Sequence, residues 1–224
     1  MSFSSTNSKD QEQEFDSLYT EKSLHDSIHL LVRAIKFASE KHQFQKRKRE
    51  HPIPYINHPI ATVEILTECG VVNRNVLAAA ALHDTLEDTN TSKEELEREF
   101  GKEITSIVQE VTDDKKLDKV TRKKLQLEHA RTISKEAKLV KLADKYSNCM
   151  DPPPSIWSKE EYEGYNIWSY AIFLQAKGIN SLLDSKLENL FHSSLGISKE
   201  ITQTQVEEKL SNYYFLLETK YSNS

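Results

Sequence analysis

The sequence predicts an all-α protein that folds as a single domain of about ten helices, and three observations support this prediction. The 224 residues include only five glycines and six prolines, so few of the tight turns that connect short strands are available. Many segments repeat apolar residues every three or four positions, which is the spacing of one helix face. A hydrophobic fraction of 37% in a chain of this length is enough to fill one core.

The first three expected helices are identified by their apolar patterns and their ends. Residues 24–42 carry apolar side chains at helical spacing and form the first helix. Pro59 fits the first position of the second helix, and Gly70 ends it, because proline is tolerated in a first turn and glycine favours the conformation that follows a helix. The third helix, residues 74–87, is almost wholly apolar in its first half and must therefore be buried.

The remaining helices follow from capping residues and glycines. Ser92 and Glu95 have the spacing of a capping box, and Gly101 separates the short helix that they open from the next one. The later expected helices are residues 103–111, 117–132, 134–148 and 157–176, and two more that are divided by Gly178 and Gly196.

The expected organisation is a flexible tail at residues 1–22, one helical domain at 23–195 and a C-terminal helical extension at 196–224. The tail is rich in polar residues and lacks the apolar segment of a secretory signal. The longest apolar run, residues 76–82, is far too short to cross a bilayer.

Charge and cysteine content limit the function classes. A net charge of −5 argues against broad nucleic-acid binding, which needs a surplus of basic residues. Cys69 and Cys149 are too few for a disulfide scaffold and form no Cys-x-x-Cys pair, so we expect reduced thiols. We therefore expect an intracellular, cytoplasmic protein that binds neither nucleic acid nor membrane, and we leave open whether it forms a homodimer.

A run of titratable residues after the apolar half of the third helix indicates a metal site. At about 3.6 residues per turn, His83 lies above Glu87, and Asp84 lies above Asp88. Three carboxylates this close repel one another, and a divalent cation would remove that cost. A helix end whose acids are only solvated is the alternative. Acids at a helix C-terminus oppose the helix dipole, however, so the pattern favours the metal site.

Two further segments offer ligands. His58 lies at the beginning of the second helix, and Asp144 is an acid on an otherwise apolar helix. Each alone is more often structural, since His58 could cap its helix and Asp144 could pair with a neighbouring lysine. Together with His83 and Asp84 they complete a set of two imidazoles and two carboxylates, which suits a transition metal such as Mn²⁺, Fe²⁺ or Zn²⁺.

Three separated motifs occur in a fixed order, namely YxxHP at 55–59, LHDxxEDT at 82–89 and LADK at 142–145. This order resembles the hydrolase domain of the RelA/SpoT family, over residues 34–176, and looks closest to the small, hydrolase-only metazoan SpoT homologs. The resemblance implies a single helical domain of the HD type. It also implies a Mn²⁺-dependent enzyme that removes pyrophosphate from the 3′ position of ppGpp and leaves GDP.

The resemblance further implies roles for individual residues. The matching positions are the metal ligands His58, His83, Asp84 and Asp144, the catalytic pair Glu87 and Asp88, and the substrate contacts Asn148, Trp157 and Tyr165. The expected metal is Mn²⁺, with Zn²⁺ or Fe²⁺ as alternatives.

The loop between the first two helices carries a basic run that is a candidate phosphate clamp. Alone, such a run is more typical of a solvated loop, but beside these motifs we expect Arg47 and Lys48 to bind substrate phosphates. An arginine of the family aligns with Glu161, which lies four residues from both Trp157 and Tyr165. If those aromatic residues line the substrate pocket, we expect Glu161 to project near the phosphates.

Three functions remain open from the sequence. The first is hydrolysis of ppGpp at a metal site. The second is action on another nucleotide, either as an NADPH 2′-phosphatase, an activity reported for the small metazoan group, or as another HD-type nucleotide phosphohydrolase. The third is a non-catalytic nucleotide sensor. Glu87 and Asp88 favour an enzyme, because a sensor needs no group that transfers protons.

Overall fold

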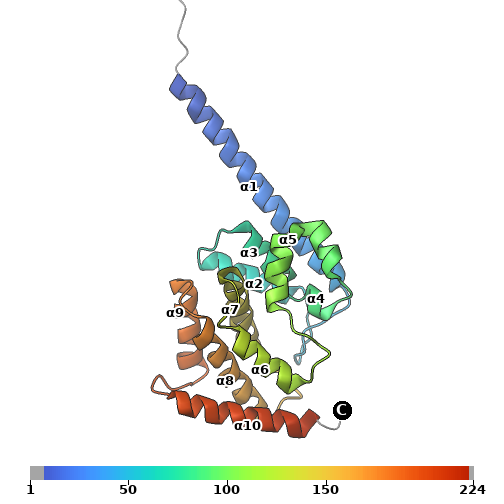
Figure 1. Ribbon diagram of the computed structural model, residues 1–224, viewed down its shortest axis with the longest axis vertical. Helices are drawn as coiled ribbons and strands as arrows, with labels where there is room; N and C mark the ends of the chain where they lie inside the picture. Colours follow the sequence, from blue (N-terminus) through green and yellow to red (C-terminus); the bar gives the residue numbers. More distant parts are fainter. Residues whose placement is uncertain (1–7, 222–224) are drawn as a thin grey trace, which may run out of the picture.

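The computed structural model describes residues 8–221, and these form an all-α fold (Figure 1). Within them there is no β-strand, and Lys46 and Pro54 form an isolated bridge. The helices are α1 (Ser8–Lys41), α2 (Asn57–Glu68), α3 (Arg74–Leu82), α4 (Thr85–Asp88), α5 (Lys93–Val111), α6 (Lys119–His129), α7 (Lys135–Met150), α8 (Lys159–Ala176), α9 (Ser181–Asn189), the π-helical η1 (Leu190–Ser194) and α10 (Gln203–Tyr221). The predicted fold class is confirmed.

Helix α3 lies at the centre of the half of the fold that carries the ligand motifs. Residues 76–82 are all buried, as their apolar character predicts, and α1, α2, α5 and α7 pack around them. Four consecutive alanines at 78–81 let these neighbours approach closely, and Ala34 and Ala38 of α1 are fully buried as well. The last turn of α3 is therefore held in a fixed position.

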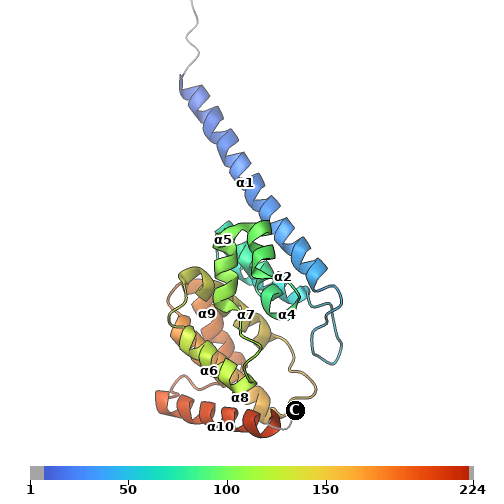
Figure 2. The same cartoon turned by 45° about the vertical axis from the view of Figure 1, so that its right-hand side comes forward.

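Helices α8 and α10 form the opposite end of the molecule, where α10 crosses the base in both views (Figures 1 and 2). Helix α8 packs against α7, α6 and α10. A Cβ atom on Gly164 would lie 2.2 Å from Tyr213 Cδ2, so α8 and α10 approach this closely only because residue 164 is glycine.

Helix α1 begins earlier than the apolar pattern predicts. It starts at Ser8, so its backbone includes residues 8–22 of the expected tail, while residues 1–7 lie outside the described part of the chain. Figure 1 shows α1 projecting away from the other helices. The apolar repeat marks only where a helix packs, and polar residues such as Glu, Gln and Lys extend a helix without one. The flexibility of the tail and the domain limits at 22 and 195 remain predictions.

The expected helix at residues 74–87 is divided into two. Helix α3 ends at Leu82, and α4 begins at Thr85. The Thr85 hydroxyl donates to the Leu82 carbonyl at 2.7 Å, which satisfies an acceptor that the end of α3 leaves free. His83 and Asp84 therefore lie at a helix junction rather than inside one continuous helix.

Two expectations about cysteines and membranes can be compared with the structure. Cys69 and Cys149 are buried free thiols, and burial raises the pKa of Cys149 to about 11, which keeps its thiol protonated. Within residues 8–221, no helix combines the length and the apolar character that a transmembrane span requires.

Candidate active site

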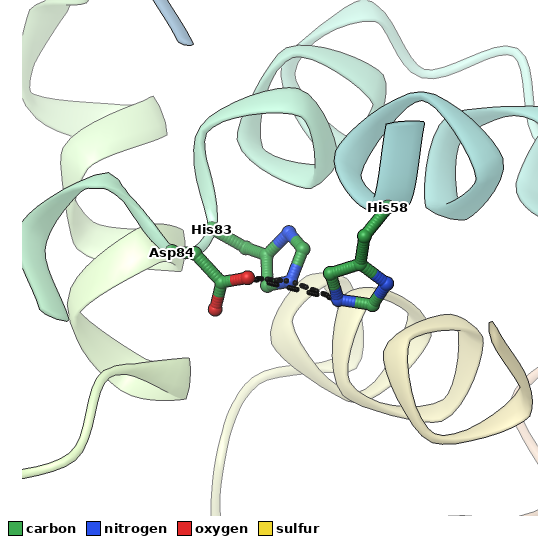
Figure 3. Close-up of side chains that lie close together, drawn as sticks. All are labelled: His58, His83 and Asp84. Carbon is green, nitrogen blue, oxygen red and sulfur yellow. Dashed lines mark hydrogen bonds and ion pairs between the residues drawn. The ribbon is translucent and has the colours of Figure 1, made fainter. Parts of the chain in front are cut away.

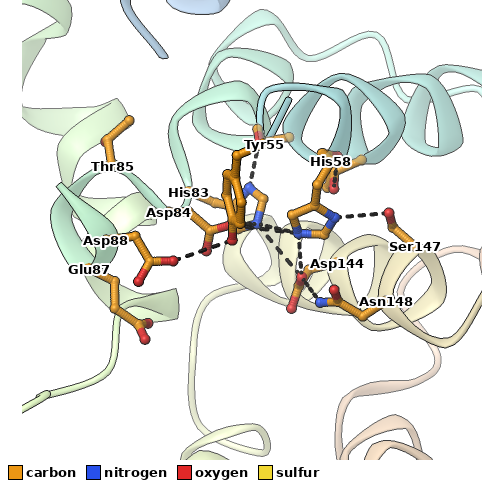
Figure 4. A network of polar contacts seen from close by, with 12 residues as sticks. Tyr55, His58, His83, Asp84, Thr85, Glu87, Asp88, Asp144, Ser147 and Asn148 are labelled. Atoms are coloured by element: carbon orange, nitrogen blue, oxygen red, sulfur yellow. Dashed lines mark hydrogen bonds and ion pairs between the residues drawn. The ribbon is translucent and has the colours of Figure 1, made fainter. Parts of the chain in front are cut away.

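Four side chains from three separate segments converge at the centre of the fold. Figure 3 shows His58 from α2 facing His83 and Asp84 from the α3–α4 junction, and Figure 4 adds Asp144 from α7. The His58 Nε2 atom lies 3.2 Å from His83 Nε2 and 3.0 Å from Asp144 Oδ1. The His83 Nε2 atom lies 3.1 Å from Asp84 Oδ2. Both imidazoles are buried, and the whole predicted ligand set is brought together.

Each imidazole is oriented by a contact of the ring nitrogen that faces away from this centre. His83 Nδ1 lies 2.8 Å from the carbonyl oxygen of Ala80, which can only accept, so Nδ1 donates and the neutral His83 ring has its lone pair at Nε2. His58 Nδ1 lies 3.0 Å from Ser147 Oγ, and this contact fixes the orientation of the His58 ring. The ligand atoms of His58, His83 and Asp84 lie within 4.8 Å of one another. Electron-rich nitrogen and oxygen atoms at such distances fit a divalent transition metal.

Burial and charge set the protonation of these groups. Burial alone would raise the pKa of Asp84, but the adjacent His83 outweighs it and lowers this pKa. Lys145 likewise lowers the pKa of Asp144 against the effect of burial. Burial lowers the pKa of His58, whereas Asp84 raises that of His83 despite burial. A proton on His83 and a bound cation are thus alternative ways to neutralise the two carboxylates.

Tyr55 holds two of the acidic groups in place. Its hydroxyl donates to Asp84 Oδ2 at 2.7 Å and lies 3.3 Å from Asp88 Oδ2. The ring stacks on His42, with a centroid distance of 4.9 Å, and this contact fixes where the hydroxyl points. In the sequence, Tyr55 stands out only as the first residue of the YxxHP motif. Its position three residues before His58, at the beginning of a helix, is the signal that could have indicated this role.

Asp144 is held from the opposite side. Lys145 Nζ donates to Asp144 Oδ2 at 2.9 Å. Asn148 Nδ2 donates to Asp144 Oδ1 at 2.5 Å (Figure 4). Arg47 in turn donates to Asn148 Oδ1 at 2.7 Å. This bond connects the basic loop to the group formed by His58, His83, Asp84 and Asp144, which is called the ligand cluster below. The lysine pairing that the sequence offered as a structural role for Asp144 is therefore present together with the ligand geometry.

The predicted catalytic pair lines a cavity of about 180 Å³ beside the ligand cluster. Glu87 accepts a hydrogen bond from the Asp113 backbone N–H at 3.1 Å, and burial raises the pKa of its carboxyl to about 7. Asp88 pairs with Lys115 and lies closer to solvent. The two carboxyls therefore differ in environment, and the Glu87 carboxyl can hold or release a proton near neutral pH.

A second cavity, of about 610 Å³, adjoins the first. The predicted substrate contacts all line it, and these are Arg47, Lys48, Asn148, Trp157 and Tyr165. Tyr55 and Asp88 line both cavities, so the two spaces meet at the ligand cluster. The Trp157 and Tyr165 rings lie 5.2 Å apart and form an aromatic wall. Arg47 Nε donates to Asp151 Oδ2 at 2.9 Å, which orients this guanidinium at the rim.

The expectation that Glu161 projects near the phosphates was wrong. Its side chain is 2% exposed and lies outside the residues that line the larger cavity. The carboxylate accepts from the Ser158 backbone N–H in a capping box and pairs with Lys220 of α10. Helix α8 begins only at Lys159, so Trp157 precedes it, and the spacing of residues on one helix face does not apply to Trp157 and Glu161.

Comparisons with known proteins found a family and relatives that this chain resembles. The family model described as an HD domain matches residues 34–152. The chain is 48% identical to guanosine-3′,5′-bis(diphosphate) 3′-pyrophosphohydrolase MESH1 of Xenopus tropicalis, over 72% of this chain and 93% of the relative. It is 46% identical to the MESH1 protein of Homo sapiens, over 72% of this chain and 92% of that one.

A solved structure has a similar fold. It is described as a metazoan ortholog of SpoT that hydrolyzes ppGpp and plays a role in starvation responses. The TM-score is 0.73 at 39% sequence identity, and the match covers 75% of this chain and 97% of that chain. The likeness therefore extends over nearly the whole of the smaller protein.

Proposed function

The chain belongs to the HD domain family and, within it, to the MESH1 group of pyrophosphohydrolases, and on this basis we propose that it hydrolyses ppGpp at the 3′ position. The observation that carries the proposal is the convergence of two imidazoles and two carboxylates beside a cavity with a cationic rim. Water adds to the phosphorus attached to the 3′ oxygen. The bond between this phosphorus and the 3′ oxygen breaks, and GDP and pyrophosphate leave.

A divalent cation is assigned to the ligand cluster within the same proposal. His58, His83, Asp84 and Asp144 would hold it, and Mn²⁺ suits this mixed nitrogen and oxygen set, with Zn²⁺ or Fe²⁺ as alternatives. When bound, such an ion supplies Lewis acidity and lowers the pKa of water. Tyr55, Lys145 and Asn148 keep the two carboxylates oriented.

Glu87 and Asp88 are assigned to proton transfer and to positioning of the attacking water. Glu87, with a pKa raised to about 7, accepts a proton from the water or donates one to the departing 3′ oxygen. Asp88 lines both cavities and is oriented by Tyr55 and Lys115, so it lies where water and the phosphate group meet. One proton of the water ends on the 3′ oxygen and the other leaves with the pyrophosphate product.

The larger cavity is assigned to the nucleotide. Arg47 and Lys48 bind the phosphates at the rim, because charge-assisted hydrogen bonds to phosphate are strong and directional. The Trp157–Tyr165 wall offers aromatic faces for the purine, and Asn148 lies between this wall and the metal ligands.

A product assay with Mn²⁺ and two substrates, ppGpp and NADPH, tests the proposal. We expect GDP and pyrophosphate from ppGpp. Release of phosphate from NADPH with no turnover of ppGpp would instead assign the site to the 2′-phosphatase reaction. Binding of both nucleotides without any product would leave the nucleotide-sensor function.

A further inference from the structure

The C-terminal helix α10 is attached to the fold beside the nucleotide cavity. It packs on α8 and α6, at the base of the molecule in Figures 1 and 2. The HD domain match ends at residue 152, so α8 and α10 lie outside it. The MESH1 relative from Xenopus tropicalis is covered over 93% of its length but matches only 72% of this chain, so this chain carries additional residues.

The last turn of α10 contacts the turn that precedes α8 and the first turn of α8. Lys220 Nζ pairs with the Glu161 carboxylate and donates to the Ile156 carbonyl oxygen at 3.3 Å. The Tyr221 hydroxyl donates to Glu161 Oε1 at 3.3 Å. Glu161 also accepts from the Ser158 backbone N–H at 3.2 Å, so residues 156–161 are held at both ends. Trp157, which lines the nucleotide cavity, lies inside this turn.

A second contact holds the other side of the aromatic wall. Tyr213 is 3% exposed and lies against the backbone of Gly164, where a Cβ atom would meet its ring at 2.2 Å. Gly164 directly precedes Tyr165, the partner of Trp157 in the wall. Lys123 Nζ lies 5.3 Å from the Tyr213 ring and 4.8 Å from the Tyr165 ring, so this one nitrogen lies close to both rings.

We propose that α10 is a positioning element that sets the Trp157–Tyr165 wall of the nucleotide cavity through the Glu161–Lys220 pair and the Tyr213–Gly164 contact. None of these four residues lines that cavity, so they act through the two aromatic residues rather than on the substrate. The inference rests on the proposed function, because it concerns the nucleotide side of the same site. Loosening the wall weakens nucleotide binding and leaves the ligand cluster unchanged.

Lys220→Met tests the inference, and Lys209→Met is the matched control because Lys209 is exposed on the same helix. We expect Lys220→Met to raise KM for ppGpp by roughly tenfold while kcat stays within about twofold of the wild type. Lys220→Arg keeps the ion pair with Glu161 and should restore KM. If Lys220→Met lowers both kcat and the melting temperature but leaves KM unchanged, the role of Lys220 is merely structural and the inference is overturned.

Tryptophan fluorescence gives a readout that does not depend on turnover. The chain has two tryptophans, and Trp168 is 2% exposed, so quenching by acrylamide reports mainly on Trp157. Lys220→Met should increase this quenching, and Lys209→Met and Lys220→Arg should not. Unchanged quenching in Lys220→Met overturns the inference even if KM rises. If the wild-type protein fails to hydrolyse ppGpp, the proposed function falls, and quenching still decides whether α10 positions Trp157.

Discussion

The ligand cluster and the wall of the nucleotide cavity are built in different ways. The ligands lie on α2 and α7 and at the α3–α4 junction, and neighbouring side chains hold both carboxylates. The nucleotide cavity is lined largely by the loop between α1 and α2 and by the turn before α8, together with Asn148 of α7 and Tyr165 of α8. The amino-acid sequence of loops varies more among relatives than the sequence of the rigid helices that carry them.

We expect this difference to separate reaction chemistry from substrate choice. The HD domain match at residues 34–152 includes every proposed metal ligand but ends before Trp157 and Tyr165. We therefore expect changes in the cluster to abolish metal binding and turnover, and changes in the cavity wall to alter KM. The following predictions test that division, beginning with the largest expected effect.

His83→Ala should remove the metal and nearly all activity. The variant deletes one proposed nitrogen ligand and leaves the carboxylates of Asp84 and Asp144 without the imidazole that lies beside both. Because a metal contributes several kcal/mol to the transition state, we expect a loss on the order of 10⁴-fold. Metal content and ppGpp turnover are measured together, and His129→Ala, an exposed histidine on α6, is the control. Full metal occupancy in His83→Ala would contradict the ligand assignment.

Glu87→Gln and Asp88→Asn should lower kcat by roughly 10²- to 10⁴-fold while metal content stays near that of the wild type. Both carboxyls line the small cavity beside the ligands, and proton transfer requires an ionisable group there. Single-turnover kinetics and metal analysis separate the two effects. Loss of metal in both variants would place these residues among the ligands instead.

Tyr55→Phe should weaken metal affinity or turnover by roughly 10- to 100-fold, which is typical of a residue that orients a ligand. The variant keeps the ring that stacks on His42 and loses only the hydroxyl that donates to Asp84. Metal titration followed by activity measurement checks this. An unchanged metal affinity with unchanged kcat would show that Asp84 needs no such partner.

Arg47→Ala should raise KM roughly 10- to 100-fold, because a charge-assisted hydrogen bond to phosphate is lost at the cavity rim. Metal content should remain that of the wild type, since Arg47 contacts Asn148 and Asp151 rather than a ligand. Arg131→Ala, at an exposed position, is the control. A fall in kcat with unchanged KM would assign Arg47 to turnover, and it would contradict the expected separation between turnover and substrate binding.

Glu87 should make the stability of the metal-free protein depend on pH. Burial raises the pKa of its carboxyl from 4.5 to about 7, so the fold favours the neutral form. This contribution is fully present below about pH 4.5 and is lost as the pH rises through about 7, at most about 3 kcal/mol by pH 8. Urea unfolding in EDTA at pH 5 and pH 8 should show Glu87→Gln gaining stability relative to wild type only at the higher pH. Exposed Glu103→Gln should show no such change.

The sequence by itself determined the features that depend on a few neighbouring residues. Glycines, prolines and apolar periodicity predicted the helical class, and the Ser92 cap and the bend at Gly101 are present as expected. The motifs also named the four side chains that converge, and their role as metal ligands remains a prediction. Local signals suffice here because a cap or an apolar face involves only residues within one or two turns.

Only the tertiary structure decided which segments approach one another. His58 and Asp144 are 86 residues apart in sequence, and the packing of α2 against α7 brings their side chains to 3.0 Å. The break between Leu82 and Thr85 and the turn of Glu161 toward α10 were not predicted, because both depend on partners outside the local pattern. Helix periodicity fixes direction only within one helix, and the position of each helix is set by the side chains that pack against it.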